Sequence, residues 1–214
     1  VPALENFGFR VIDTIPTTLE TAREKLGSVH DFVLALGGGQ PLDVLGHAPI
    51  IEDALTAMLN GAGEDDAFNR LIVGTGLSAR EANWLRAFYR YLRQTGLNYT
   101  INTAVDALMH APFVTLGLVD LFRARHQPGM AGREGAEALA EAAIRDGLAK
   151  VSGINDDRLL RSFRAVVLAV LRTNAFVDSG HEALALKFDS ALVPGLPKPL
   201  PWREIFVYAR RVEG

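Results

Sequence analysis

The sequence predicts an α+β fold that is predominantly α-helical, a helical bundle flanked by short β-strands at both ends. Apolar and polar residues alternate near the N-terminus, a helical spacing of apolar residues governs the long middle, and alternation returns near the C-terminus. These changes of period divide the chain into three expected regions, which are residues 1–45, 46–180 and 181–214.

The first region is expected to hold a strand pair. Alternating apolar residues predict a strand over residues 7–15, which Pro16 is expected to end. A short helix or turn over residues 17–27 leads to a second strand at 29–36. The run Gly37–Gly39 then predicts a glycine-rich loop.

The middle region has the apolar spacing of a helical bundle. Helical patterns cover residues 49–61, 64–76, 77–96, 101–129 (two helices parted near Pro112), 133–151 and 155–176. The clearest helix begins at Ser78, which forms a predicted capping box with Glu81. The last helix is expected to take Asn155 as its N-cap.

The third region returns to the alternation of strands. Residues 182–190 predict one strand, a proline-rich link follows, and β-branched and aromatic residues over 204–209 predict another. The terminal strand is expected to pair either with residues 182–190 or with the N-terminal strands.

Composition restricts the class of protein. The chain is 49% hydrophobic and 22% charged, with a formal charge of -3, so nothing points to nucleic acid or an anionic membrane. The absence of cysteine excludes disulfides and thiolate sites. The longest apolar run, Ala165–Leu171, is far shorter than the roughly 20 residues of a membrane span. We expect a cytoplasmic protein, and the initial Val1 suggests a piece of a longer chain.

Glycines, carboxylates and histidines could each form a site, but none of the three groups has the pattern of one. The glycine run lacks a dinucleotide fingerprint, because Leu42 stands where the third glycine belongs. The carboxylates of residues 64–66 are expected to stabilise a helix N-terminus rather than bind a metal. The histidines are scattered, without the spacing of a helical metal site, at positions His30, His47, His110, His126 and His181.

Arg86, Arg90 and Arg93 line one face of the capped helix. They could hold an anion or contact a neighbouring domain, but the favoured interpretation is a solvated face opposite an apolar stripe. The residues themselves indicate no catalytic, cofactor-binding or metal site.

Five short motifs, taken in order, resemble one family. They are FNRL at 68–71, YLRQ at 91–94, LRTN at 171–174, EIFVY at 204–208 and RVEG at 211–214. Together with the longer segments around them, they resemble the large class of bacterial NAD-specific glutamate dehydrogenases over nearly the whole chain.

The resemblance implies an internal segment of such an enzyme, just before its catalytic domain. The strand pair would be the remnant of an ACT-like unit, and the terminal strand would lead into the catalytic half. The catalytic and NAD-binding residues would lie outside this chain. The parent enzyme would use NAD, and the partners would be other domains of the same polypeptide and further copies in a homo-oligomer.

The leading interpretation is therefore a non-catalytic regulatory or structural segment of an enzyme that oxidatively deaminates L-glutamate to 2-oxoglutarate. One alternative is an amino-acid-binding ACT-like regulatory module. A second alternative is a helical protein-interaction module.

Overall fold

The computed structural model describes residues 2–21, 24–36, 46–177, 183–210 and 212–214. The N-terminal half contains α1 (Pro2–Asn6), β1 (Phe9–Glu20), β2 (Lys25–Leu36), α2 (Ala48–Leu59), the 3-10 helix η1 (Ala67–Asn69), α3 (Arg70–Thr75) and α4 (Ala79–Gln94). The rest contains α5 (Ile101–His110), α6 (Pro112–His126), α7 (Arg133–Leu148), α8 (Ile154–Ala169), β3 (Val170–Thr173), β4 (Leu184–Phe188), the 3-10 helix η2 (Ser190–Leu192), β5 (Glu204–Ala209) and β6 (Val212–Glu213). The predicted α+β class, dominated by helices, is confirmed.

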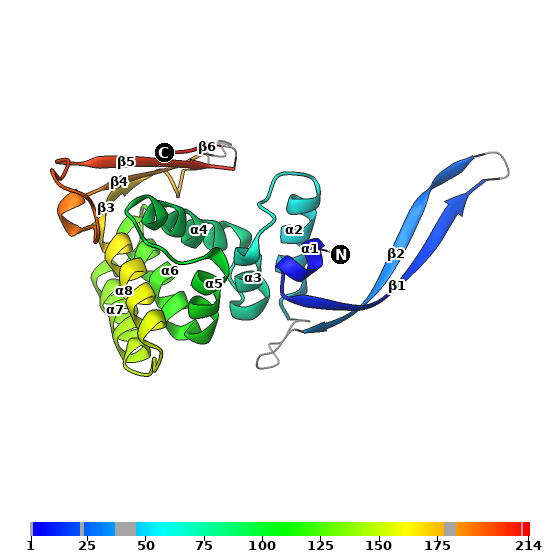
Figure 1. The fold of residues 1–214 in the computed structure, drawn as a ribbon, viewed down its shortest axis with the longest axis horizontal. Coiled ribbons are helices and arrows are strands. Elements are labelled where there is room, and N and C mark those ends of the chain that lie inside the picture. The colour runs from blue at the N-terminus through cyan, green and yellow to red at the C-terminus, as the bar shows by residue number, and fades with distance from the viewer. Residues whose placement is uncertain (1, 22–23, 37–45, 178–182, 211) are drawn as a thin grey trace.

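Strands β1 and β2 form a long antiparallel hairpin that projects from the helical body (Figure 1). Pro16 does not end the first strand as predicted, because it pairs opposite His30 in a two-stranded ribbon, where an edge strand tolerates a residue without an N–H. Of the helix or turn predicted over 17–27, the helix is wrong, because both strands extend into this range, and a turn remains in which the Thr21 backbone N–H donates to the Glu24 carbonyl at 2.8 Å. The predicted glycine-rich loop lies outside the described residues.

The helical body packs around α4, α6 and α8 (Figure 1), and the apolar side chains of these helices form one large core. Helices α6 and α7 approach closely because glycines stand at their contact. A Cβ added at Gly117 would lie 2.8 Å from Ile144 Cγ1, and one at Gly147 would lie 2.5 Å from Val114 Cγ2. The capping box of Ser78 and Glu81 is present as predicted.

The last helix differs from its prediction at both ends. Gly153 rather than Asn155 is the N-cap of α8, and the helix ends at Ala169. The next residues form β3, in which Val170 pairs with Phe188 of β4. The apolar run that ends at Leu171 suits a buried helix and a buried strand equally, so periodicity could not place this boundary.

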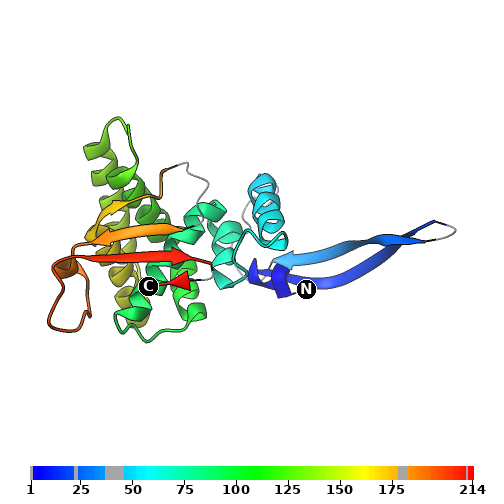
Figure 2. The same ribbon diagram turned by 90° about the horizontal axis from the view of Figure 1, so that it is seen from above.

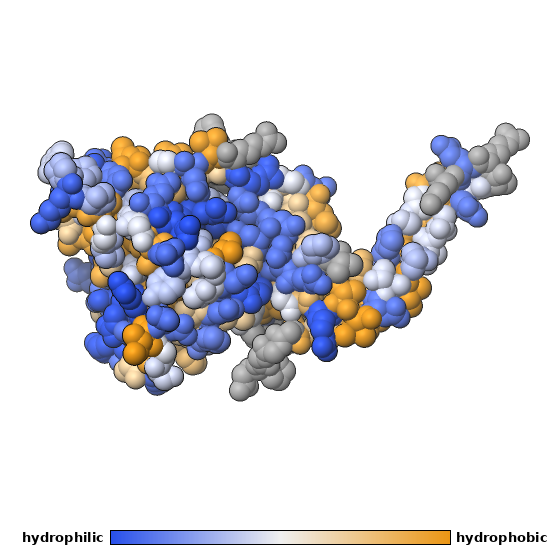
Figure 3. All heavy atoms as spheres, in the orientation of Figure 1, coloured by the Kyte–Doolittle hydropathy of each residue, from blue (hydrophilic) through white to orange (hydrophobic). Residues whose placement is uncertain are grey.

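The C-terminal sheet has the antiparallel order β3-β4-β5-β6 and lies across the helical body (Figures 1 and 2). Its inner face contributes Leu186, Phe188 and Phe206 to the core, while Ile205 and Val207 of β5 point outward. Figure 3 shows apolar atoms along this outer edge of the molecule. The terminal strand is confirmed, and of its two expected partners it pairs with β4.

No single helix among the described residues is long and apolar enough to cross a membrane. Helices α5 and α6 together have the length and composition of a broken span, but they are bent by 98° and most of their apolar side chains are buried in the core.

Candidate functional site at the junction of helix α4 and the C-terminal sheet

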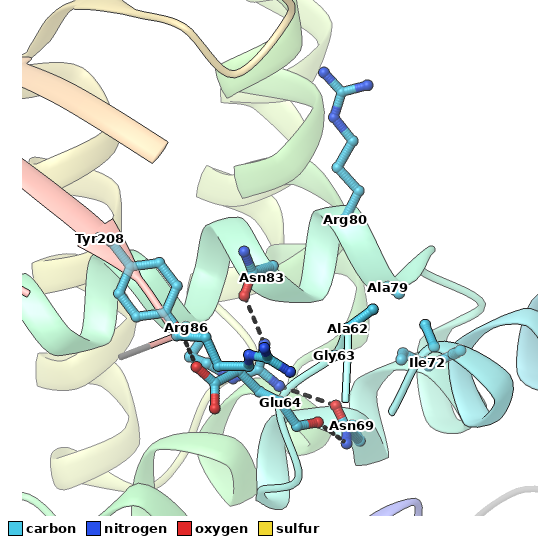
Figure 4. A pocket seen from close by; sticks show the side chains of 13 residues that line it. Ala62, Gly63, Glu64, Asn69, Ile72, Ala79, Arg80, Asn83, Arg86 and Tyr208 are labelled. Carbon is cyan, nitrogen blue, oxygen red and sulfur yellow. Dashed lines mark hydrogen bonds between the residues drawn. The ribbon is translucent and has the colours of Figure 1, made fainter. Parts of the chain in front are cut away.

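Arg86 is buried beneath the C-terminal sheet, with only 2% of its surface exposed. Its Nε and Nη2 donate to the Asp66 carboxylate at 2.9–3.0 Å, Nη2 also donates to Asn69 Oδ1, and Nη1 donates to Asn83 Oδ1 (Figure 4). The solvated-face interpretation is therefore wrong for Arg86. A buried guanidinium requires such a set of acceptors, because an unpaired charge away from water is costly.

The loop before α3 supplies the acceptors for Arg86. Asp66 caps η1, accepting a hydrogen bond from the Phe68 backbone N–H at 2.9 Å, and this cap turns its carboxylate toward α4. Asn69 donates to the Glu64 backbone carbonyl at 2.7 Å, which holds its side chain beside the guanidinium. The guanidinium also lies 5.6 Å from the Phe68 ring centroid. The carboxylates of residues 64–66 thus act mainly within the fold, as predicted for Asp66.

Two tyrosine–carboxylate hydrogen bonds join the helical body to strand β5. Tyr91 of α4 donates to Glu204 Oε2 at 2.6 Å, and Tyr208 of β5 donates to Glu64 Oε1 at 3.0 Å. The two bonds run in opposite directions, one hydroxyl coming from each side of the junction. The Tyr91 ring also stacks on Phe188, with 4.1 Å between centroids and an interplanar angle of 9°.

Burial raises the pKa of Tyr91, and the Glu204 carboxylate beside the hydroxyl raises it further. Burial likewise raises the pKa of Tyr208, against the opposing effect of the Arg86 guanidinium. Both phenols therefore stay protonated at neutral pH and remain hydrogen-bond donors. Their role here is to bind the two elements together rather than to exchange protons.

A cleft of about 220 Å³ opens beside this junction. Its polar lining is formed by Arg86, Asn83, Asn69, Glu64 and Tyr208, and Arg210 also lines it. Its apolar end is formed by small side chains and one isoleucine, namely Ala54, Ala57, Ala62, Ile72 and Ala79. Figure 4 shows the Arg86 guanidinium between Asn83 and Asn69, while Arg80 points away from the cleft.

Arg90 and Arg93 do not share the Arg86 site. They line a separate cavity of about 560 Å³ together with Glu213, which lies 3.8 Å from Arg90 Nε. Arg93 Nη1 donates to the Tyr99 backbone carbonyl at 3.2 Å. The three arginines predicted as one anion or interdomain contact therefore divide between two places.

The described residues contain no group of three or more histidine, aspartate or glutamate side chains able to hold a metal. Asp65 accepts a hydrogen bond from Asn6, and His110 contacts Asp156 at 3.1 Å. Burial, reinforced by Arg125 and Arg133, lowers the pKa of His126 to about 4. His181 lies outside the described residues.

The direction of the strands tests whether this chain fits the NAD cofactor that the resemblance implies. A dinucleotide-binding unit needs parallel strands joined by a helix, with the phosphates at the helix N-terminus. Both sheets in the described part of the chain are antiparallel. These residues do not fit an NAD-binding unit of that kind, and no chemical step through NAD is derived from them.

The sequence alone does not predict the two bridging hydrogen bonds, and of their four partners only Glu64 is indicated, as one of the carboxylates of residues 64–66. Tyr91 was counted only as part of a helix, and Glu204 and Tyr208 only as part of a strand. The available signal was linear: these three residues stand within the YLRQ and EIFVY motifs. Glu64 lies 144 residues before its partner, and no local pattern connects them.

The fold and the junction define a helical module onto which a later antiparallel sheet is fastened by buried side chains. Three family models match the chain: the glutamate dehydrogenase ACT3 domain at residues 1–46, helical motif 3 of glutamate dehydrogenase at 63–128, and the catalytic domain of bacterial NAD-glutamate dehydrogenase at 143–214. The chain belongs to the family of bacterial NAD-specific glutamate dehydrogenases.

Curated relatives agree with these matches. The chain is 35% identical to the NAD-specific glutamate dehydrogenase of Pseudomonas aeruginosa over 224 residues and 37% identical to that of Halomonas elongata over 219 residues, each covering 100% of the chain. It is 42% identical to the Mycobacterium tuberculosis enzyme over 170 residues, covering 76% of the chain. The chain spans only 14% of the length of the first two relatives and 10% of the third.

The two sides of the junction between α4 and β5 belong to different family matches. Glu64 and Tyr91 lie in the helical motif, and Glu204 and Tyr208 lie in the catalytic-domain match. The N-terminal hairpin lies in the ACT3 match, which fits the ACT-like remnant predicted for it.

Proposed function

We propose that this chain is a structural segment of an enzyme that oxidatively deaminates L-glutamate to 2-oxoglutarate with NAD, and that it fastens the first strands of the catalytic region to the helical module. The observation that carries this proposal is the pair of opposed tyrosine–carboxylate hydrogen bonds, Tyr91 to Glu204 and Tyr208 to Glu64. The relatives' names support the activity of the whole protein.

In this proposal the chain holds strand β5 in place and carries out no chemical step itself. Helix α4 is buried along most of its length, so strand β5, which Tyr91 holds through Glu204, has little freedom to shift. The catalytic-domain match begins at residue 143, upstream of the lead-in predicted over 181–214, so we assign helix α8 to the catalytic side of the joint. We also propose that the catalytic and NAD-binding residues lie outside this chain. Its partners would be the other domains of the same polypeptide and further copies in a cytoplasmic homo-oligomer.

The experiment is a comparison of full-length enzyme variants. Tyr208→Phe and Glu204→Gln should lower kcat for glutamate oxidation, because each loosens strand β5 without touching a reacting group. Tyr99→Phe is the matched control, since it also removes a tyrosine hydroxyl bond, here to Asn155 at 3.3 Å, away from β5. Equal kcat values for all three variants and the wild type would contradict the proposal.

A second candidate function is an amino-acid-binding ACT-like module, which the ACT3 match over residues 1–46 favours. A ligand that binds only the native state must raise its melting temperature. Thermal unfolding of the 214-residue chain with each L-amino acid tests this candidate. A concentration-dependent rise that is lost when the hairpin residue Phe32 is changed to Ser would support it.

A further inference from the structure

The cleft beside Arg86 has a polar end and an apolar end, and we propose that it binds a small carboxylate-bearing molecule with a short aliphatic chain. Tyr208 and Glu64 of the joint also line the cleft, but binding of a ligand there does not depend on the activity proposed for the whole enzyme. The proposed binding rests on the shape of the cleft, the donors at one end and the alanines at the other.

The polar end presents donors that the fold already holds in place. The Arg86 side chain is only 3% exposed, and its bonds to Asp66, Asn69 and Asn83 fix the guanidinium at the inner wall. Those bonds use Nε, both hydrogens of Nη2 and one hydrogen of Nη1. Among the described residues Nη1 makes one hydrogen bond, to Asn83, and so has a second hydrogen to donate, and the Asn83 amide that lines the cleft adds a further donor.

The charge around the cleft favours an anion. Arg86 and Arg210 line the cleft together with one carboxylate, Glu64, whereas the Arg80 side chain points away from it (Figure 4). The Asp66 carboxylate does not line the cleft. Asp66 pairs with Arg86, and Tyr208 donates to Glu64. Arg210, which also lines the cleft, forms no ion pair with any described residue, so it is available to a bound anion.

The apolar end sets the second requirement. Ala57 and Ala54 of α2, with Ile72 of α3, form a wall of small aliphatic groups that offers no charged partner. A bare oxyanion would leave this wall in contact with water, whereas an aliphatic carboxylate covers it. Each methylene that leaves water contributes enough to tighten binding about fourfold.

The test is a titration of the 214-residue chain, followed by 1H–15N NMR, with acetate, propionate, butyrate, an aliphatic L-amino acid and inorganic phosphate. Saturable shifts centred on the Gly63 and Asn83 amides are expected, with affinity rising about fourfold per methylene from acetate to butyrate. Tighter binding of the amino acid than of the matching simple carboxylate would identify the ligand as a zwitterion. Tighter binding of phosphate than of every carboxylate would overturn the proposal.

Two matched pairs of variants locate the site. Ala57→Leu fills the apolar end and should weaken butyrate binding at least about tenfold, while Ala143→Leu on the exposed face of α7 should leave it unchanged. Arg210→Gln should weaken all carboxylates, while Arg158→Gln on the surface of α8 should not. An absence of saturable shifts in the wild type, or equal binding by Ala57→Leu and wild type, would refute the inference.

Discussion

Removing the Tyr91 hydroxyl tests the joint between α4 and β5 at its shortest hydrogen bond. The ring is 1% exposed and stacks on Phe188, so Tyr91→Phe keeps the packing and deletes only the hydroxyl. The lost bond is a 2.6 Å contact with the Glu204 carboxylate. The substitution therefore isolates one polar interaction across the joint.

The expected cost follows from the charge and burial of the acceptor. Hydrogen bonds to charged groups contribute about 1.5–3 kcal/mol. Because Glu204 is partly exposed, water can solvate its carboxylate after the change, so a value near 1.5 kcal/mol is expected. Tyr91→Ala also removes the buried ring between Phe188 and Phe206, and should cost about 3–5 kcal/mol.

Urea denaturation of the 214-residue chain measures both values, from the shift in midpoint at constant m. Glu204→Gln and the double variant complete a cycle, in which a coupling of about 1 kcal/mol is expected. Tyr99→Phe, whose hydroxyl bond at 3.3 Å is exposed, should cost less than about 0.5 kcal/mol. A Tyr91→Phe value no larger than that control, with no coupling to Glu204, would refute the reasoning.

Three further changes test the packing and charge of the body. Asp66→Asn leaves a buried guanidinium without its counter-charge and should cost about 3–5 kcal/mol in urea denaturation. Asp157→Asn removes a pair with Arg161 at the surface of α8 and should have a much smaller effect. Gly117→Ala places a methyl group 2.8 Å from Ile144 Cγ1 and should lower stability by about 1–3 kcal/mol, although alanine favours helix; an increase in the melting temperature would contradict this. The pKa of His126 is lowered from 6.5 to about 4, so the unfolded chain takes up its proton first as the pH falls. Up to about 3 kcal/mol of stability should therefore be lost between pH 6.5 and pH 4. The loss should be smaller in His126→Phe, and an identical pH profile of the variant and the wild type would contradict the assignment.

Features that depend on neighbouring residues were predictable from the sequence. The Ser78 and Glu81 capping box needs only a three-residue spacing, and the alternation in β5 needs only the two faces of a sheet. The helical middle between two strand regions followed from the same local periodicities.

Features that depend on distant residues were not predictable. The positions of Arg86, Arg90 and Arg93 suggested one exposed row, but Asp66 reaches the first of them from 20 residues away and the fold buries it. Pro16 predicts a strand end because it lacks an N–H, but the missing N–H matters only if a further strand pairs on that side. In the two-stranded hairpin no such strand is present among the described residues, and β1 continues through Pro16. In both cases the deciding partner comes from the tertiary structure.

The central claim is that the C-terminal sheet and the helical module unfold as one unit through the α4–β5 joint. Native-state hydrogen exchange of the 214-residue chain measures this directly. The amides of Phe206 and Leu186 should exchange with the same opening free energy as buried amides of α4 and α8. Tyr91→Ala should lower the opening free energy of the sheet amides before that of the helices. Exchange of β4 and β5 in the wild type through a separate opening, several kcal/mol below that of α4, would contradict it.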